Sequence, residues 1–348
     1  MNAPVNPIHL PRFALRSADL GRRLDIFLVC AVGSVLGNRV FLIITGYPQL
    51  GNGTLHISHA IWGALMMAIA IVFALSFLAP NNRTFIAFIG GCGFGWFIDE
   101  LGKFITRDVN YFFKPTIALI YMVFIAMYLV FRTIERRAFG PDEAVLNALE
   151  ALKAAALGEL AEPKRNAAVA LLDETGATTP LAQQVRSLLV DAPNLPDPAP
   201  GFWSRRGTRV RARYLGIAEH HWFVVSVTWL FGILGVGSVV TAVLLALGDA
   251  QIHGFTEWAY TVSSGVSGLL TVVGLFLIRR DRLAAYRWFE RGVLVQIFVT
   301  QVFEFASQEL AGVTGLIANI ALWLALRSMI RAEIERQELR IEELPVLP

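Results

Sequence analysis

Ionisable and polar side chains interrupt three apolar stretches in the first third of the sequence. They are Asn38 and Arg39 in the first stretch, His56 and His59 in the second, and Asp99, Glu100 and Lys103 in the third. An ionisable side chain in hydrocarbon costs about 2.5 to 3.5 kcal/mol even on insertion scales, so such residues are usually paired and functional. We expect these seven side chains to meet at one depth, near the outer boundary of a membrane.

Two kinds of chemistry fit this set. A buried carboxylate can carry a proton or hold a cation, and histidine adds a second group that titrates near neutral pH. Alternatively, His56 and His59 with Asp99 or Glu100 offer the nitrogen and oxygen ligands that suit a divalent metal such as zinc. That site would hydrolyse a lipid-type substrate at the outer surface. The H-x-x-H spacing differs from the H-E-x-x-H spacing of metalloproteases, which weakens the metal interpretation.

Each residue also has a structural interpretation. The histidines can be solvated by lipid headgroups, Asp99 and Lys103 can form an i,i+4 pair, and Arg39 can extend toward the headgroups. Asp99 needs a partner in every case, and Arg39, Lys103 and a histidine are the alternatives. In the hydrolytic interpretation, Lys103 or Arg39 would stabilise an oxyanion or hold a headgroup phosphate.

A second polar series in the last third of the sequence suggests a duplication. Residues four apart share one face of a helix, and the third apolar stretch has such a series in Gly91, Gly95, Asp99 and Lys103. Adding 205 to each number gives Gln296, Thr300, Glu304 and Gln308. Asp99 and Glu304 are then equivalent, as in parallel transporter repeats. The second series would line an aqueous path or form a hydrogen-bonded seam between helices.

The composition is that of a membrane protein. Of the 348 residues, 55% are hydrophobic and only 16% are charged, whereas soluble domains carry about a quarter charged residues. The two cysteines, Cys30 and Cys92, lie inside apolar stretches, so neither a disulfide framework nor a cysteine metal site is indicated.

The sequence predicts an all-α fold with eight transmembrane helices. A helix needs about 20 apolar residues to cross the hydrocarbon layer. The predicted spans are Ile26 to Thr45, Ile57 to Leu78, Phe85 to Phe104, Pro115 to Phe131, Trp222 to Leu247, Trp258 to Ile278, Gly292 to Gln308, and Ala311 to Leu326.

The distribution of lysine and arginine predicts the orientation of these spans. Cytoplasmic flanks hold the excess of basic residues. With both termini inside, only Lys103, Arg107 and Lys114 of the 30 basic residues fall in outer loops. We therefore predict a bacterial-type inner (plasma) membrane protein with both termini in the cytoplasm.

Residues 132–221 form a predicted cytoplasmic insert of small helices. Asp142 is expected to cap the first helix, the second runs from Lys164 to Glu174, and the third starts at Thr179. A proline-rich linker, Ala192 to Pro200, and the arginines at 205, 206, 209, 211 and 213 follow. Beside a span, such arginines are typical of a flank that rests on lipid headgroups rather than a nucleic-acid site.

The predicted organisation has five parts. They are a cytoplasmic N-terminal segment (1–24), a first four-helix repeat (25–131), the insert (132–221), a second four-helix repeat (222–327) and a cytoplasmic tail (328–348).

Three functions remain open at this stage. A duplicated multi-pass protein favours a transporter or channel for a cation or small solute, with Asp99 and Glu304 as carriers. The alternatives are a membrane-embedded metal-dependent hydrolase and a scaffold or sensor that signals through the insert. The expected partners are membrane lipids, a cation or small solute, and a second copy or protein partner at the insert, with no nucleic acid.

Overall fold

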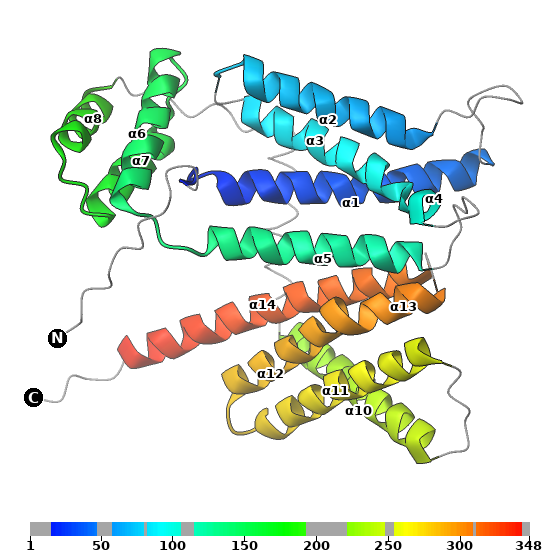
Figure 1. The fold of residues 1–348 in the computed structure, drawn as a ribbon. Helices are drawn as coiled ribbons and strands as arrows, with labels where there is room; N and C mark the ends of the chain where they lie inside the picture. Colours follow the sequence, from blue (N-terminus) through cyan, green and yellow to red (C-terminus); the bar gives the residue numbers. More distant parts are fainter. Residues whose placement is uncertain are drawn as a thin grey trace, which may run out of the picture. The chain divides into compact units, whose positions relative to one another are not determined.

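The computed structural model describes seven segments of the chain, and all of its regular elements are helices (Figure 1). The segments are residues 15–46, 58–79, 82–105, 115–192, 221–247, 254–308 and 311–342. The chain divides into two compact units. One comprises Met1–Tyr111 with Val123–Ala199, and the other comprises Phe112–Met122 with Pro200–Pro348. Each unit is described by itself.

Five helices within the described segments are long and apolar enough to cross a membrane. They are α1 (Leu20–Thr45), α2 (His59–Ser76), α5 (Thr116–Glu135), α11 (Phe255–Leu277) and the portion Gly312–Ile334 of α14 (Gly312–Glu342). These helices expose many apolar side chains; Leu75 is 83% exposed. A soluble surface rarely tolerates such exposure over whole helices, whereas a lipid environment does. The helices are therefore compatible with a membrane location.

Helices also occupy the other three predicted spans. They are α3 (Asn82–Asp99), α10 (His221–Leu247) and a broken helix made of α12 (Arg282–Val295), the π-helix η2 (Gln296–Thr300) and α13 (Gln301–Gln308). These three do not meet the length and composition criteria for a span among the described residues. Eight crossings therefore remain a prediction.

Glycines allow the close packing of α1, α2 and α3 in the first unit, where α3 contacts both other helices (Figure 1). A Cβ at Gly63 would lie 2.6 Å from the carbonyl oxygen of Gly93, so α2 and α3 cross with their backbones in contact. On another face of α3, a Cβ at Gly91 or Gly95 would overlap backbone atoms of α1. The face of α3 that carries Gly91 and Gly95 therefore packs closely against α1.

The second unit is packed around α11, which contacts both α10 and α12. The Ser267 hydroxyl donates to the carbonyl oxygen of Gly292 at 2.8 Å, and a Cβ at Gly292 would lie 3.0 Å from the carbonyl oxygen of Ser267. Of α10, α11 and α12, the second in chain order, α11, is therefore central. In the first unit the third helix in chain order, α3, is central instead. This difference in packing order gives the predicted duplication no support, and the duplication is not confirmed.

The π-helix corrects one expectation about the second polar series. We expected Gln296, Thr300, Glu304 and Gln308 to share one uninterrupted face. A π-helix inserts an extra residue into the turn, so positions before and after it are rotated relative to one another. Thr300 is 1% exposed, whereas Gln308 is exposed. The Tyr121 hydroxyl donates to the carbonyl oxygen of Ile297 at 2.7 Å within this turn.

Three helices of the predicted insert form a small core of their own in the first unit. They are α6 (Pro141–Ala156), α7 (Glu162–Glu174) and α8 (Pro180–Asp191). The Thr179 side chain caps α8 by accepting from the Ala182 amide at 3.2 Å, as its position predicts. The expected cap at Asp142 is wrong, because the N-cap of α6 is Gly140, two residues earlier. The proline-rich linker after Ala192 and the arginine group lie outside the described residues.

A buried ion pair fastens α6 to the segment that precedes α1. The Arg16 guanidinium and the Glu143 carboxylate are 3.0 Å apart and 8% and 1% exposed as residues. The Arg16 and Gly140 amides also donate to this carboxylate, and the Ala18 amide donates to Asn147 Oδ1 at 2.7 Å. Burial alone would raise the pKa of the Glu143 carboxyl, but these hydrogen bonds outweigh it and hold the pKa below its ordinary value.

The first prediction concerns the contact of Gly95 with α1. In Gly95→Ala the new Cβ would overlap the Ala31 carbonyl and the Ser34 hydroxyl. We expect a loss of about 1–3 kcal/mol of stability, which is typical of overpacking. The matched control is Gly33→Ala, where nothing lies within 4 Å of the new Cβ. Thermal unfolding followed by circular dichroism should separate the two variants, and equal melting temperatures would contradict this packing.

The second prediction concerns Glu143 and acid. Because the folded-state pKa is lowered, its stabilising contribution is fully present above the ordinary glutamate pKa of about 4.3 and is lost as pH falls through the folded-state pKa. Hydrogen exchange at the Arg16 and Ala18 amides, corrected for the intrinsic effect of pH, should therefore accelerate in acid. Glu143→Gln should accelerate it already at neutral pH, and Glu174→Gln, an exposed site, should not. Protection that persists in Glu143→Gln would refute the role of this carboxylate.

Candidate functional site

The predicted polar residues of the first unit gather where α3 ends. Asp99 is the last residue of α3, and Glu100 lies in the turn before the short helix α4 (Leu101–Ile105). The Glu100 amide donates to the Phe97 carbonyl and the Lys103 amide donates to the Glu100 carbonyl, which are bonds of a tight turn. This turn sends the two neighbouring carboxylates toward different partners.

Asp99 is held by two consecutive residues of α1. The Arg39 Nε donates to Asp99 Oδ1 at 2.6 Å, and the Asn38 Nδ2 donates to Asp99 Oδ2 at 2.8 Å. Asp99 is 1% exposed, Asn38 6% and Arg39 8%. Each carboxylate oxygen therefore has a donor, and the negative charge is matched by a guanidinium, as a buried charge requires.

The close approach of α1 and α3 makes this contact. Gly95 lies one turn before Asp99 on the same face of α3, and its missing side chain allows α1 to approach. The Ser34 hydroxyl reaches across the same contact and lies 3.1 Å from the Cys92 carbonyl oxygen. Ser34 carries no signal of this contact in the sequence, because a serine in an apolar helix usually bonds to its own helix.

Glu100 has partners from two other elements. Its Oε2 lies 2.6 Å from the Lys103 ammonium, and its Oε1 lies 3.3 Å from His59 Nδ1 at the start of α2. Glu100 is 1% exposed, whereas the side chains of His59 and Lys103 are each 20% exposed. The acid is thus buried beneath two groups that reach the surface of the unit.

The charged groups of this cluster balance one another. Asp99 and Glu100 are formally negative and Arg39 and Lys103 are formally positive, so these four groups together are neutral.

Of the three alternatives for the partner of Asp99, the structure shows Arg39. Lys103 contacts Glu100 instead, because α3 ends at Asp99 and the i,i+4 face of the helix does not continue. His59 also contacts Glu100 rather than Asp99. His56 lies outside the described residues.

The proposed metal ligands do not form a metal site within the described part of the chain. No three histidine, cysteine, aspartate or glutamate residues there lie close enough together to hold a metal ion. Of the four proposed ligands, His59 and Glu100 are neighbours, and both oxygens of Asp99 accept hydrogen bonds from α1. A zinc site that includes His56 therefore remains only a prediction.

In the second unit, polar groups surround the π-helix. Thr300 is 1% exposed, and the neighbouring Gln301, which our sequence analysis missed, is 0% exposed. The Gln301 amide donates to the Gly312 carbonyl at 2.9 Å. Glu304 packs against Gly315, where a Cβ would lie 2.8 Å from its carboxylate. Gln301 is a polar residue in an apolar stretch, which is a signal that the sequence contains. It does not belong to the series of residues spaced four apart, so it was not predicted.

No family model, no curated protein and no solved structure matches this chain.

The third prediction tests the buried pair. Asp99→Asn removes the carboxylate that pairs with the buried Arg39 guanidinium, and breaking one partner of a buried pair costs about 3–5 kcal/mol. The double variant Asp99→Asn/Arg39→Gln should lose less stability than the sum of the single variants. Glu290→Gln is the control, since its 3.4 Å pair with Arg327 is partly exposed and should contribute less than about 1 kcal/mol. Additive losses in a double-mutant cycle of thermal unfolding would show that the residues do not interact.

Proposed function

We propose that this protein is a multi-pass membrane transporter for a proton or a small cation, with the Asp99 cluster as its ion-binding site. The observation that carries the proposal is a carboxylate, 1% exposed, held by Arg39 and Asn38 on a closely packed neighbouring helix. Ionisable residues in such places mark ion pathways and proton relays in membrane proteins.

The chemistry of a buried ion pair supports coupling to a conformational change. When a proton or cation neutralises Asp99, Arg39 loses its ion pair with this carboxylate in a poorly solvated place. Breaking a buried pair is strongly unfavourable, so the occupied state favours a rearrangement of α1 against α3. Such a dependence of conformation on occupancy is what a carrier needs.

The second acid supplies a route for the proton. His59 and Lys103 reach the surface of the unit, and Glu100 lies beneath them. In this proposal His59 exchanges protons with the outer aqueous phase and passes them toward the buried carboxylates.

The remaining features of the proposal come from the sequence. We propose eight spans in a bacterial-type inner membrane, both termini in the cytoplasm, and Glu304 as a second carrier. The mechanism above requires only the first unit, so it does not depend on the duplication. Nothing in the described residues favours the hydrolase, and we do not develop it.

A sensor is a second candidate, which the Arg16 and Glu143 pair favours. This buried pair, together with the hydrogen bonds of Asn147 to Ala18 and Arg16, couples α6 to the start of α1. The same helix ends near Asn38 and Arg39. A rearrangement of α1 that starts at Asp99 would therefore be transmitted to the insert.

The fourth prediction tests the transporter. The purified chain in liposomes that contain a pH-sensitive dye should move protons when monovalent or small organic cations are added outside. We expect Asp99→Asn to reduce this flux to the level of empty liposomes, because an amide cannot take up a proton or hold a cation. Asp173→Asn, an exposed site in the insert, is the control and should transport normally.

The possible outcomes separate the two candidates. Full flux in Asp99→Asn would contradict the role of this carboxylate. If the wild type moves no ion, but neutralising Asp99 changes hydrogen exchange in α6, the sensor replaces the transporter.

A further inference from the structure

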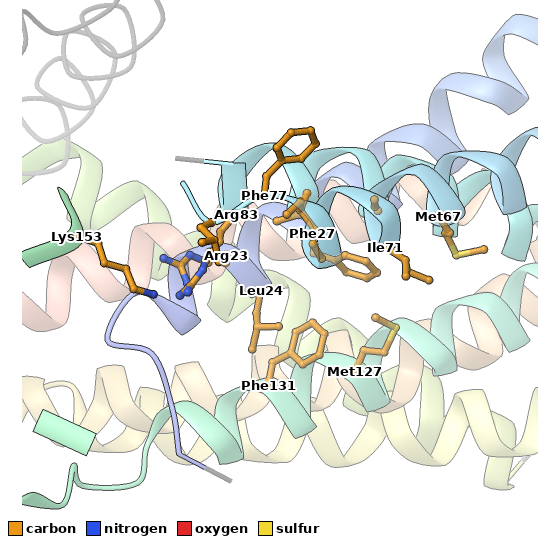
Figure 2. A pocket seen from close by; sticks show the side chains of 16 residues that line it. Arg23, Leu24, Phe27, Met67, Ile71, Phe77, Arg83, Met127, Phe131 and Lys153 are labelled. Carbon is orange, nitrogen blue, oxygen red and sulfur yellow. The ribbon is translucent and has the colours of Figure 1, made fainter. Parts of the chain in front are cut away.

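A cavity of about 720 Å³ lies in the first unit between α1, α2, α3 and α5 (Figure 2). Arg23 lines it near the start of α1, whereas Arg39 lies 16 residues further along that helix. A helix rises 1.5 Å per residue, so Arg23 and Arg39 are about 24 Å apart along α1, and no residue of the Asp99 cluster lines the cavity. The cavity is thus a separate feature, at the end of α1 that the charge distribution predicts to be cytoplasmic.

The inner wall of the cavity is apolar and made of adaptable side chains. Its lining includes Phe27 from α1, Met67 and Ile71 from α2, and Met127 and Phe131 from α5. Figure 2 shows these side chains on one side of the cavity, away from the cationic groups. Unbranched methionines adjust to flexible apolar ligands, so this wall suits a hydrocarbon chain.

Three cations lie at the other side of the cavity: Arg23, Arg83 and Lys153 (Figure 2). Two carboxylates accompany them. Glu150 bonds to both Arg83 and Lys153, at 3.0 and 3.1 Å, and Asp19 lies 3.2 Å from Arg23. Three positive and two negative groups leave one positive charge, which one phosphodiester would neutralise.

We propose that this cavity binds an anionic phospholipid, with the phosphate beside Arg23, Arg83 and Lys153 and an acyl chain along the apolar wall. Basic pockets between transmembrane helices on the cytoplasmic side are typical sites for anionic lipid headgroups. The cavity volume also lies in the range of about 300–1,000 Å³ that is usual for small-molecule sites. A free phosphate would use the cations and leave the apolar wall without a ligand. Because Lys153 belongs to α6, the lipid would contact both the insert and the spans.

The fifth prediction tests this site by native mass spectrometry of the purified full chain, with phosphatidylglycerol and phosphatidylcholine offered at equal concentration. The wild type should retain phosphatidylglycerol preferentially. Each arginine near a membrane surface contributes about fivefold to binding of anionic lipid, so Arg23→Gln/Arg83→Gln should lose most of that preference. Arg136→Gln, an exposed cation at the end of α5 that does not line the cavity, should keep it.

A steric pair of variants tests the apolar wall. Ala87 lines the cavity, whereas Ala126 is exposed on α5 and does not line it. Ala87→Trp should reduce retention of phosphatidylglycerol, and Ala126→Trp should leave it unchanged. Circular dichroism of each variant checks that the fold is intact, and an unfolded Ala87→Trp is replaced by Ala87→Leu.

Several results would overturn the proposal. One is equal retention of the two lipids by the wild type. Another is equal loss of preference in Arg136→Gln, which would indicate general attraction to a basic surface. Displacement of the lipid by inorganic phosphate alone, or unchanged retention in a folded Ala87 variant, would show that the apolar wall is not used. Since the readout is binding, these results are independent of any flux through the Asp99 cluster.

Discussion

The structure of the first unit depends on the match between a buried carboxylate and the helix that supplies its counter-ion. Asp99 can lie at an interior position only because Arg39 and Asn38 reach both of its oxygens. Those contacts need α1 and α3 in nearly direct backbone contact, and the glycines of α3 provide it. The ion pair and the glycine face therefore depend on each other: without close packing the charge has no partner, and without the pair the buried acid disfavours packing.

This dependence gives the first unit two ends with different chemistry. At one end of α1, acids and bases are paired and buried. At the other end, Arg23 and its neighbours lie beside an apolar cavity and are only partly neutralised. The glycine crossing lies between them, so a closely packed helix pair connects the two ends of α1. The ion pair of Arg16 with Glu143 extends this connection to the insert.

Much of this could be predicted from the sequence, because charge in an apolar stretch is a strong signal. Asn38, Arg39, Asp99, His59 and Glu100 were all identified, and the structure brings them together in two neighbouring groups. Their pairing could not be predicted, since it depends on the register of α1 against α3 and on the exact residue where α3 ends. The spacing of four also predicted that Lys103 and Asp99 share one helix face. The turn at Glu100 instead directs the Lys103 side chain toward Glu100.

The second unit shows a different limit of sequence reasoning. A spacing of four assumes a regular helix, and the π-helix at Gln296–Thr300 breaks it, so Gln301 becomes buried in place of an expected neighbour. No local propensity identifies such a turn in this sequence. In the insert the start of α8 was predicted correctly, since the Thr179 and Pro180 pair is a local signal. The pairing of Arg16 with Glu143 spans 127 residues of sequence and has no local signature.

The most direct test of the account is a measurement of the Arg39 and Asp99 contact in a bilayer. Solid-state NMR of protein labelled with ¹⁵N in arginine side chains and ¹³C in aspartate carboxyl groups detects dipolar coupling between the two nuclei, and Asp99→Asn assigns the signal. The account predicts a strong coupling that disappears in Arg39→Gln. Absence of the coupling in the wild type would contradict it.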